Sequence, residues 1–338
     1  MQFKFPQIIR EKYLVLPILF LFINVMALAQ QYTKYPMDVQ RVVFTDLNEA
    51  LKDPERVFRL KLSGQKMGEV PESLLVFKNL QMLWLDSVGL KEFDLEKGTF
   101  KNLLFLSLMG NQLTDLKIPP GCMSDLNQLY LDDNQLTEFP DVANPFIAIT
   151  TLSIRQNKIT QIPAPCEEWK HLRFLYLDYN PLKNANQAFA LSSDFERLSF
   201  YQTGLRTLKC SQAQRKLVKL VISDNLIDFK DWNPDDFPRL AYLDVSYHPN
   251  LGPEFWNKAV ELPRLKFLVV ESAGIQEIPS SIGALKGLRE ISLLGNEINH
   301  LPQEFYALDL RLINLEYNPL ASRDKEQLSQ VFGKNVYY

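Results

Sequence analysis

Three cysteines and three histidines are the residues of this chain whose side chains most readily bind metals or form covalent bonds. Cys122, Cys166 and Cys210 each lie 44 residues from the next. In an exported protein such a set favours a disulfide, and with histidines it could hold zinc. The histidines are far apart along the chain, at His171, His248 and His300. Whether any of these side chains meet depends on the elements that place them.

Other motifs of catalysis are missing from the sequence. Asp132 and Asp133 form an acidic pair, but calcium needs six to eight oxygen ligands and two carboxylates alone are weak evidence for a site. The sequence contains no nucleophile elbow, phosphate loop, zinc-peptidase helix or paired-cysteine motif. The net charge of −3 does not favour strong nucleic-acid binding. We therefore expect a binding protein, with no catalytic residues, cofactor or metal.

A repeated apolar pattern runs through most of the chain. Leu103-x-x-Leu106-x-Leu108-x-x-Asn111-x-Leu113 returns as Leu126-x-x-Leu129-x-Leu131-x-x-Asn134-x-Leu136. The same frame begins at Val57, Leu80, Leu103, Leu126, Ile149, Leu172, Phe195, Leu217, Leu240, Leu265, Leu288 and Leu310. Successive frames are 23 residues apart six times running, and then 22, 23, 25, 23 and 22. The apolar alternation that opens each frame predicts a short strand.

This pattern resembles the leucine-rich-repeat family over residues 57–320, and it is similar to bacterial exported members with 23-residue repeats. The resemblance implies an α/β fold: a right-handed horseshoe solenoid of about twelve repeats, with a parallel β-sheet on its concave face. It also implies that this face recognises a partner. The chain departs from extracellular animal members by lacking cysteine-clustered caps. It also lacks the ligase domain of repeat-bearing bacterial effectors, so that activity is not implied.

The repeat bears directly on the cysteines. They fall two repeats apart, so stacking separates consecutive sulfurs by roughly 10 Å, whereas a disulfide needs α-carbons within about 7 Å of each other. We expect three free thiols buried in the outer wall, and no metal bound by them.

An asparagine near the end of each frame is expected to tie successive turns together, because an amide both donates and accepts hydrogen bonds. Seven repeats have it: Asn111, Asn134, Asn157, Asn180, Asn225, Asn296 and Asn318. Five repeats depart from it, with Gln65, Val88, Thr203, His248 and Ala273. These five turns are predicted to be less well tied.

The chain divides into four predicted segments. Residues 1–29 are typical of a secretory signal peptide, with a basic start, a short apolar run and a small-x-small triplet. Residues 30–56 are predicted to form a helical N-terminal cap, residues 57–320 the twelve repeats, and residues 321–338 a C-terminal cap made of a helix and a last short strand. No later stretch is long enough to span a membrane.

The outward positions of the strands are the candidate binding residues. Aromatic residues and serines alternate at the strand centres, in the order Trp84, Ser107, Tyr130, Ser153, Tyr176 and Ser199. The predicted partner-binding residues on the concave face are Trp84, Phe105, Tyr130, Asp132, Asp133, Arg155, Phe174, Tyr176, Asp178, Tyr179, Tyr201, Tyr242 and Tyr247.

Two interpretations of these residues remain open. Large side chains can simply fill a crowded inner curve, or exposed tyrosine and tryptophan can anchor a partner. We expect an extracytoplasmic, secreted or periplasmic, protein that binds a protein partner. Binding of a glycan or cell surface is the first alternative. An intracellular signalling scaffold is the second, should residues 1–29 not be a signal peptide.

Overall fold

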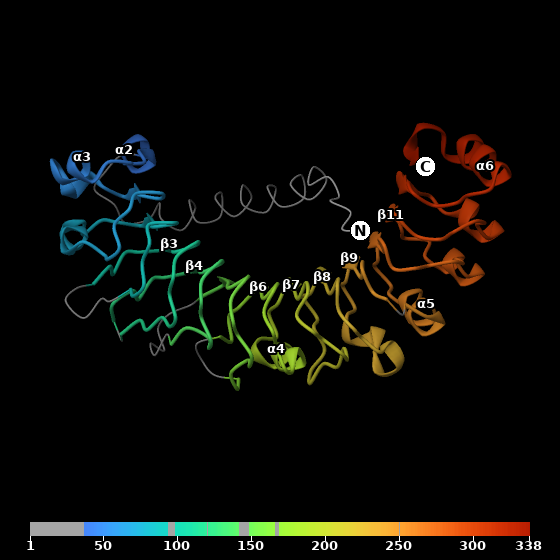
Figure 1. Cartoon of the computed structure of the whole chain (residues 1–338), viewed down its shortest axis with the longest axis horizontal. Coiled ribbons are helices and arrows are strands. Elements are labelled where there is room, and N and C mark those ends of the chain that lie inside the picture. Colours follow the sequence, from blue (N-terminus) through green and yellow to red (C-terminus); the bar gives the residue numbers. More distant parts are fainter. Residues whose placement is uncertain (1–36, 94–98, 120, 142–148, 166–168, 250) are drawn as a thin grey trace.

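The computed structural model describes residues 37–93, 99–119, 121–141, 149–165, 169–249 and 251–338. They form a curved solenoid in which each repeat makes one coil (Figure 1). The predicted signal peptide lies outside the described residues and stays a prediction. The division of the chain into caps and repeats also stays a prediction.

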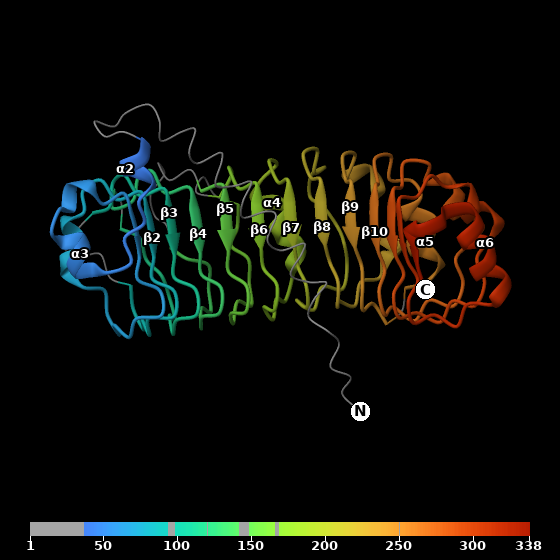
Figure 2. The ribbon, with the colours of Figure 1, turned by 90° about the horizontal axis from the view of Figure 1, so that it is seen from above.

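One 13-stranded sheet lines the inner side of the curve, and its strands lie side by side in sequence order (Figure 2). All neighbours pair in parallel, with Leu83 opposite Leu106, for instance. The strands are β1 (Arg59–Lys61), β2 (Met82–Trp84), β3 (Phe105–Ser107), β4 (Gln128–Tyr130), β5 (Thr151–Ser153), β6 (Phe174–Tyr176), β7 (Arg197–Ser199), β8 (Lys219–Val221), β9 (Tyr242–Asp244), β10 (Phe267–Val269), β11 (Glu290–Ser292), β12 (Leu312–Asn314) and β13 (Val336–Tyr337). Each predicted frame produces one strand, beginning two residues after its first residue. The expected α/β solenoid is confirmed.

The core is one continuous apolar interior between the sheet and an outer wall. The leucines of each frame point inward and are fully buried, as at Leu175 and Leu177. Because each coil is too small to bury its own apolar face, its stability depends on the coils stacked on either side.

The outer wall is made of short helices and turns (Figure 1). The α-helices are α2 (Met37–Arg41), α3 (Leu47–Leu51), α4 (Ala188–Leu191), α5 (Pro253–Ala259) and α6 (Ser322–Phe332). The 3-10 helices are η1 (Pro54–Arg56), η2 (Glu72–Val76), η3 (Ala185–Gln187), η4 (Phe229–Asp231), η5 (Pro234–Asp236), η6 (Ser280–Ala284), η7 (Gln303–Ala307) and η8 (Gly333–Asn335). A proline stands immediately before η2, η6 and η7, where no backbone donor is required.

The asparagines form a ladder along the turn that follows each strand. Asn157 is representative: its side-chain Nδ2 donates to the carbonyl oxygens of Leu131 in the preceding coil, at 3.0 Å, and of Ile154 in its own coil, at 3.2 Å. Its Oδ1 accepts from the Leu136 backbone N–H at 3.0 Å. The predicted role of these residues is therefore observed directly.

Three of the departures from asparagine show what the amide supplied. The Thr203 hydroxyl donates to the carbonyl of Phe200, within its own coil. His248 reaches the preceding coil through the carbonyl of Ile222, but its Nε2 has no hydrogen-bond partner. Gln65 donates to the carbonyl of Thr45 at 2.9 Å. The replacements keep some of the bonds of the ladder and lose others.

Both ends of the described chain pack helices against the terminal coils (Figure 1). Asp46 caps α3 by accepting from the Glu49 backbone N–H at 3.0 Å. In α6, Leu328 and Phe332 are buried, whereas Val331 is 48% exposed. Within the described residues, no helix has the length and apolar character needed to cross a membrane.

Candidate functional site

Three residues of each coil place their side chains on the concave face of the sheet: the first residue of the strand, the third, and the residue two positions beyond the strand. In the coil of β6 these first, third and fifth positions are Phe174, Tyr176 and Asp178. The next residue, in the sixth position, begins the turn.

The thirteen predicted binding residues occupy these four positions between β2 and the turn after β9. Phe105, Phe174 and Tyr242 are first-position residues; Trp84, Tyr130 and Tyr176 are third-position; Asp132, Arg155, Asp178 and Tyr201 are fifth-position; Asp133, Tyr179 and Tyr247 are sixth-position. Ten of the thirteen therefore lie on the concave face, and Asp133, Tyr179 and Tyr247 lie on the turn beside it.

The alternation of aromatic residues with serines has a bonding explanation. The Ser153 hydroxyl donates to Oδ1 of Asp132 in the preceding coil at 2.6 Å, and the Arg155 backbone N–H donates to the same oxygen at 2.8 Å. The same arrangement recurs where Asp86 accepts from Ser107 and the Met109 N–H, and where Asp178 accepts from Ser199 and the Tyr201 N–H. A coil with an aromatic residue, Leu and Asp in its third to fifth positions (an aromatic-Leu-Asp coil) is thus followed by a coil with serine in its third position (a serine coil). This pair of coils occurs three times in succession.

These bonds give Asp132 and Asp178 a structural role, since both are buried and both bind the next coil. Burial raises the pKa of the Asp132 carboxyl. The charge of Arg155 and the hydrogen bond from Ser153 lower this pKa and partly offset the effect of burial. Asp133, by contrast, is exposed and lies 3.3 Å from the amide nitrogen of Gln156. Asp132 and Asp133 therefore face different surroundings and do not converge on a cation.

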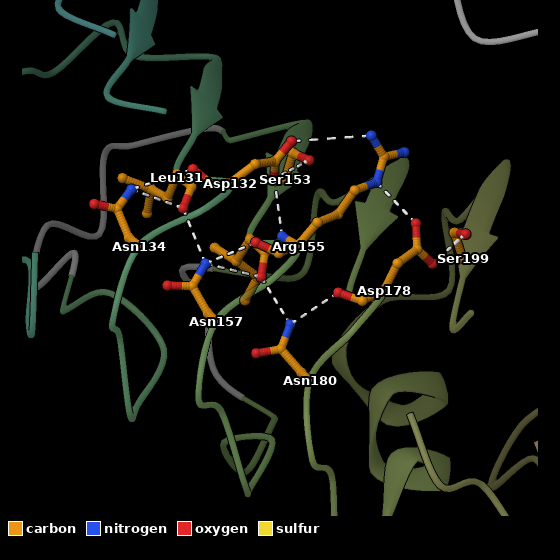
Figure 3. A network of polar contacts seen from close by, with 10 residues as sticks. Leu131, Asp132, Asn134, Ser153, Arg155, Asn157, Asp178, Asn180 and Ser199 are labelled. Carbon is orange, nitrogen blue, oxygen red and sulfur yellow. Dashed lines mark hydrogen bonds and ion pairs between the residues drawn. The ribbon is translucent and has the colours of Figure 1, made fainter. Parts of the chain in front are cut away.

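Arg155 joins the two buried acids (Figure 3). Its Nε lies 2.8 Å from Oδ2 of Asp178, and its Nη1 lies 3.9 Å from Oδ2 of Asp132. The guanidinium carbon lies 4.3 Å from the centre of the Tyr176 ring. The positive charge of Arg155 is therefore neutralised by two carboxylates and covered by a ring.

Several of the predicted aromatic residues are buried or half-buried. The Phe105 ring packs between Trp84 and Tyr130, with ring centres 4.9 and 5.2 Å away, and Phe105 is only 8% exposed. Phe174 is equally buried, and Tyr176 is half-buried. Neighbouring coils stack these rings against one another, which agrees with the interpretation that large side chains fill a crowded inner curve.

Two further cations, Arg197 and Lys219, lie beside this aromatic row, and neither is among the predicted binding residues. Arg197 opens β7, and Lys219 occupies the paired position on β8. The Arg197 guanidinium lies 5.7 Å from the Phe174 ring centre, and the Lys219 ammonium 4.0 Å from that of Tyr242. The sequence pattern that could have identified Arg197 and Lys219 as neighbours is their shared position, two residues after the start of consecutive frames.

The sixth position has a left-handed backbone in coil after coil. Gly64, Gly110 and Gly295 hold it with φ of 78°, 64° and 68°. Nine residues other than glycine hold the same conformation, and three of them are tyrosines: Tyr179, Tyr247 and Tyr317, with φ of 58°, 59° and 57°. Tyr179 is 42% exposed and Tyr317 is 76% exposed. Tyr179 also makes an edge contact with Tyr201 at 4.9 Å.

Two of the three cysteines lie among the described residues. Cys122 and Cys210 carry free thiols; Cys122 is buried, but Cys210 is partly exposed, contrary to expectation. Cys166 lies outside the described residues. Burial raises the pKa of both described thiols, so neither is an activated nucleophile. Among the described residues, no three His, Cys, Asp or Glu side chains gather as a metal site would require.

Solved structures with the same architecture are similar to this chain. TLR13, in its complex with ssRNA13, has a TM-score of 0.63 and 19% identity over 83% of this chain and 43% of its own. The leucine-rich-repeat domain of APL1B has a TM-score of 0.61 and 17% identity over 91% and 94%. The functional domain of InlJ from Listeria monocytogenes has a TM-score of 0.58 and 18% identity over 79% and 55%.

These likenesses establish the class of fold. The chain has the leucine-rich-repeat fold, and it spans less than two thirds of the TLR13 and InlJ chains that it matches. No family model and no curated protein matches the sequence.

Proposed function

We propose that this chain is a non-catalytic protein-binding module whose partner lies on the concave face and on the turn beside it, between β2 and β9. The module would present aromatic and charged side chains on a rigid sheet, so that little conformational entropy is lost on binding. Support comes from the arrangement of the predicted residues along the concave face and the turn beside it.

The observation that carries the proposal is the presence of Tyr179 and Tyr247 in the left-handed backbone conformation. A side chain with a β-carbon costs roughly 1–2 kcal/mol there, and other coils of this chain avoid the cost with glycine. Because nine residues other than glycine share this conformation, the tyrosines are distinguished by their rings, which the turn holds in a fixed place. A tyrosine at the edge of the sheet offers a large ring with a polar tip, which is the usual anchor of a protein interface.

The double variant Tyr179→Asn, Tyr247→Asn tests the proposal. Asparagine tolerates the left-handed conformation, so the free energy of unfolding should stay within about 1 kcal/mol of the wild type after loss of the Tyr179–Tyr201 ring contact. Proteins captured from an extract of the native cells should be quantified by mass spectrometry for both forms. We expect a specific protein to be captured by the wild type and lost from the variant.

A matched control is available one coil further along. Gln202 and Ser272 hold the same left-handed position in the coils that follow those of Tyr179 and Tyr247. The variant Gln202→Asn, Ser272→Asn should keep the captured protein. Equal capture by the wild type and the tyrosine variant would refute a role for this turn, and selective binding to a glycan array would favour the sugar-binding alternative.

We also propose that the mature chain acts outside the cytoplasm, after removal of residues 1–29. This rests on the basic and apolar pattern of that segment. N-terminal sequencing of the protein from its native source should begin at Gln30. An intact N-terminus would favour an intracellular scaffold instead.

A further inference from the structure

Two like charges lie next to each other at the centre of the concave face. Arg197 and Lys219 occupy paired positions on β7 and β8, where neighbouring strands are about 4.8 Å apart. Among the described residues, no carboxylate oxygen comes within 4.0 Å of either cation. Glu196, the residue immediately before β7, is instead bonded to Arg173 at 2.6 Å.

Aromatic groups hold both cations in place. The Lys219 ammonium lies over the Tyr242 ring, and the Arg197 guanidinium lies beside Phe174 and donates a hydrogen bond to the Tyr176 hydroxyl. Both side chains are half-buried. Rings position a cation without cancelling its charge, so the pair remains able to attract an anion.

The electrostatic cost of this arrangement is visible at Lys219. Burial, together with the charge of Arg197, lowers the pKa of the Lys219 ammonium, although Asp244 acts in the opposite direction. An anion placed between the two cations would relieve their mutual repulsion and favour the charged form of Lys219.

The neighbouring Arg155 shows that unneutralised cations are not a general property of this face. Arg155 lies two coils before Arg197 and contacts two carboxylates, Asp132 and Asp178. Charges buried in a protein are normally paired in this way. The absence of such a partner at Arg197 and Lys219, within the part of the chain that the structure describes, distinguishes this pair.

The surroundings define the kind of anion. Acids border the two cations on the same face and its turn: Asp178, Asp224, Asp244 and Glu271. They would repel a polyanion such as a nucleic acid, whereas a single carboxylate can be admitted between them. Half-buried apolar groups lie on the same face: Val221 on β8, the strand of Lys219, and Phe267 and Val269 on β10, two strands further along. They can contact an apolar neighbour of that carboxylate.

We propose that Arg197 and Lys219 form a binding site for the carboxylate of an Asp or Glu side chain in a protein partner, next to an apolar residue of that partner. The inference rests on the proposed function and names the chemistry that the concave face recognises. Arg197 would contribute planar donors suited to a carboxylate, and Lys219 a compact point charge.

The probe for this site is a phage library of random 12-residue peptides fused at their C-terminal ends to the coat protein, so that any selected carboxylate near the site comes from a side chain. Peptides selected on the wild type should be enriched in Asp and Glu next to apolar residues. Their affinity should fall at least about tenfold for the variant Arg197→Gln, Lys219→Gln, and it should weaken with added salt.

A second variant and a control separate charge recognition from a loss of folding. Selection on Arg197→Glu, Lys219→Glu should enrich Lys and Arg instead. The variant Arg215→Gln, Lys216→Gln makes the same change in net charge at exposed residues in the turn before β8 and should leave the acidic selection unchanged. Far-ultraviolet circular dichroism establishes that each variant is folded.

Three outcomes would overturn the inference. The first is selection without enrichment of acidic residues, and the second is equal binding of acidic peptides by the Arg197→Gln, Lys219→Gln variant. The third is tighter, Arg197-dependent binding of a 20-nucleotide single-stranded DNA, which would identify a polyanion site. Acid-independent peptides that still require Tyr179 would refute this site alone and leave the proposed function standing.

Discussion

His248 makes the stability of this solenoid sensitive to mild acid. It stands where most coils have the asparagine of the ladder, and it is only 2% exposed. Its ring packs 5.5 Å from that of Phe229, and its Nε2 has no hydrogen-bond partner. Burial lowers the pKa of the imidazole from 6.5 to about 4, against the effect of its hydrogen bond to the Ile222 carbonyl.

The sign and the size of the effect follow from this shift. Since the folded-state pKa lies below the unfolded-state pKa, His248 contributes stability that is present above pH 6.5 and is lost as the pH falls toward 4. The full shift corresponds to about 3 kcal/mol, and about 2 kcal/mol of it should be lost between pH 7.5 and pH 5.

The variant His248→Asn should remove this loss. The introduced amide has no titration in this range, and it can donate to the Ile222 carbonyl as the other ladder residues donate to theirs. The assay is urea unfolding followed by circular dichroism at pH values from 7.5 to 5. The difference in free energy of unfolding between wild type and variant should change by about 2 kcal/mol across this interval.

A control variant isolates the buried imidazole. His171 lies on the surface, and His171→Asn should follow the wild-type profile. If the wild type and His248→Asn lose stability in parallel as the pH falls, the imidazole is not held neutral by burial and the reasoning is refuted.

Three further predictions concern bonds between coils. Asn157→Ala should lower the free energy of unfolding in urea by about 2–4 kcal/mol, because it leaves buried backbone groups of two coils unbonded; a loss below about 1 kcal/mol would count against the ladder. Arg155→Met should cost about 3 kcal/mol at pH 7 by leaving the Asp132 and Asp178 carboxylates buried without a cation. Because burial raises the pKa of Asp132, that cost should shrink as the pH falls and this carboxyl is protonated, and a pH-independent cost would contradict it. Burial would raise the pKa of Asp324, but hydrogen bonds from His300, Leu301 and Tyr306 outweigh burial and lower this pKa. The loss of unfolding free energy caused by Asp324→Asn, measured in urea, should therefore be large at pH 7 and smaller at pH 3. An equal loss at both pH values would exclude this linkage.

The strands and the ladder could be predicted from the sequence because their signals are local and repeat in every coil. The Leu-x-Leu pairs locate each strand, and an asparagine such as Asn157 marks each turn. The departure at His248 was visible as well, but its unpartnered Nε2 was not, since that depends on which groups the preceding coil presents.

The bonding on the concave face could not be predicted from the same signals. The alternation of Tyr130 and Ser153 is plain in the sequence, yet the serine's partner, Asp132, is found only when the register of the strands is known. The burial of rings such as Phe105 could not be predicted either, because strand alternation shows which way a side chain points and not how closely the neighbouring coils cover it.

The left-handed turns had a signal that could have been used. Gly64, Gly110 and Gly295 share the position that Tyr179 and Tyr247 occupy in other coils, so the glycines indicate a backbone that tyrosine adopts only at a cost. Arg197 and Lys219 had no such signal, because their unneutralised state depends on where every nearby carboxylate points.

The serine-to-carboxylate bonds make two coils, not one, the unit by which the middle of this protein can be shortened or lengthened. Deleting the single coil that contains Ser153 would bring two aromatic-Leu-Asp coils together, and Asp132 would then face a coil without its serine hydroxyl. Deleting the 46 residues from Leu126 through His171 would instead join the coil of Ser107, which bonds Asp86, to the coil of Tyr176 and Asp178. Every serine-to-carboxylate bond that remains would be preserved. Changes in the length of this region, in evolution or in the laboratory, should therefore be tolerated in even numbers of coils.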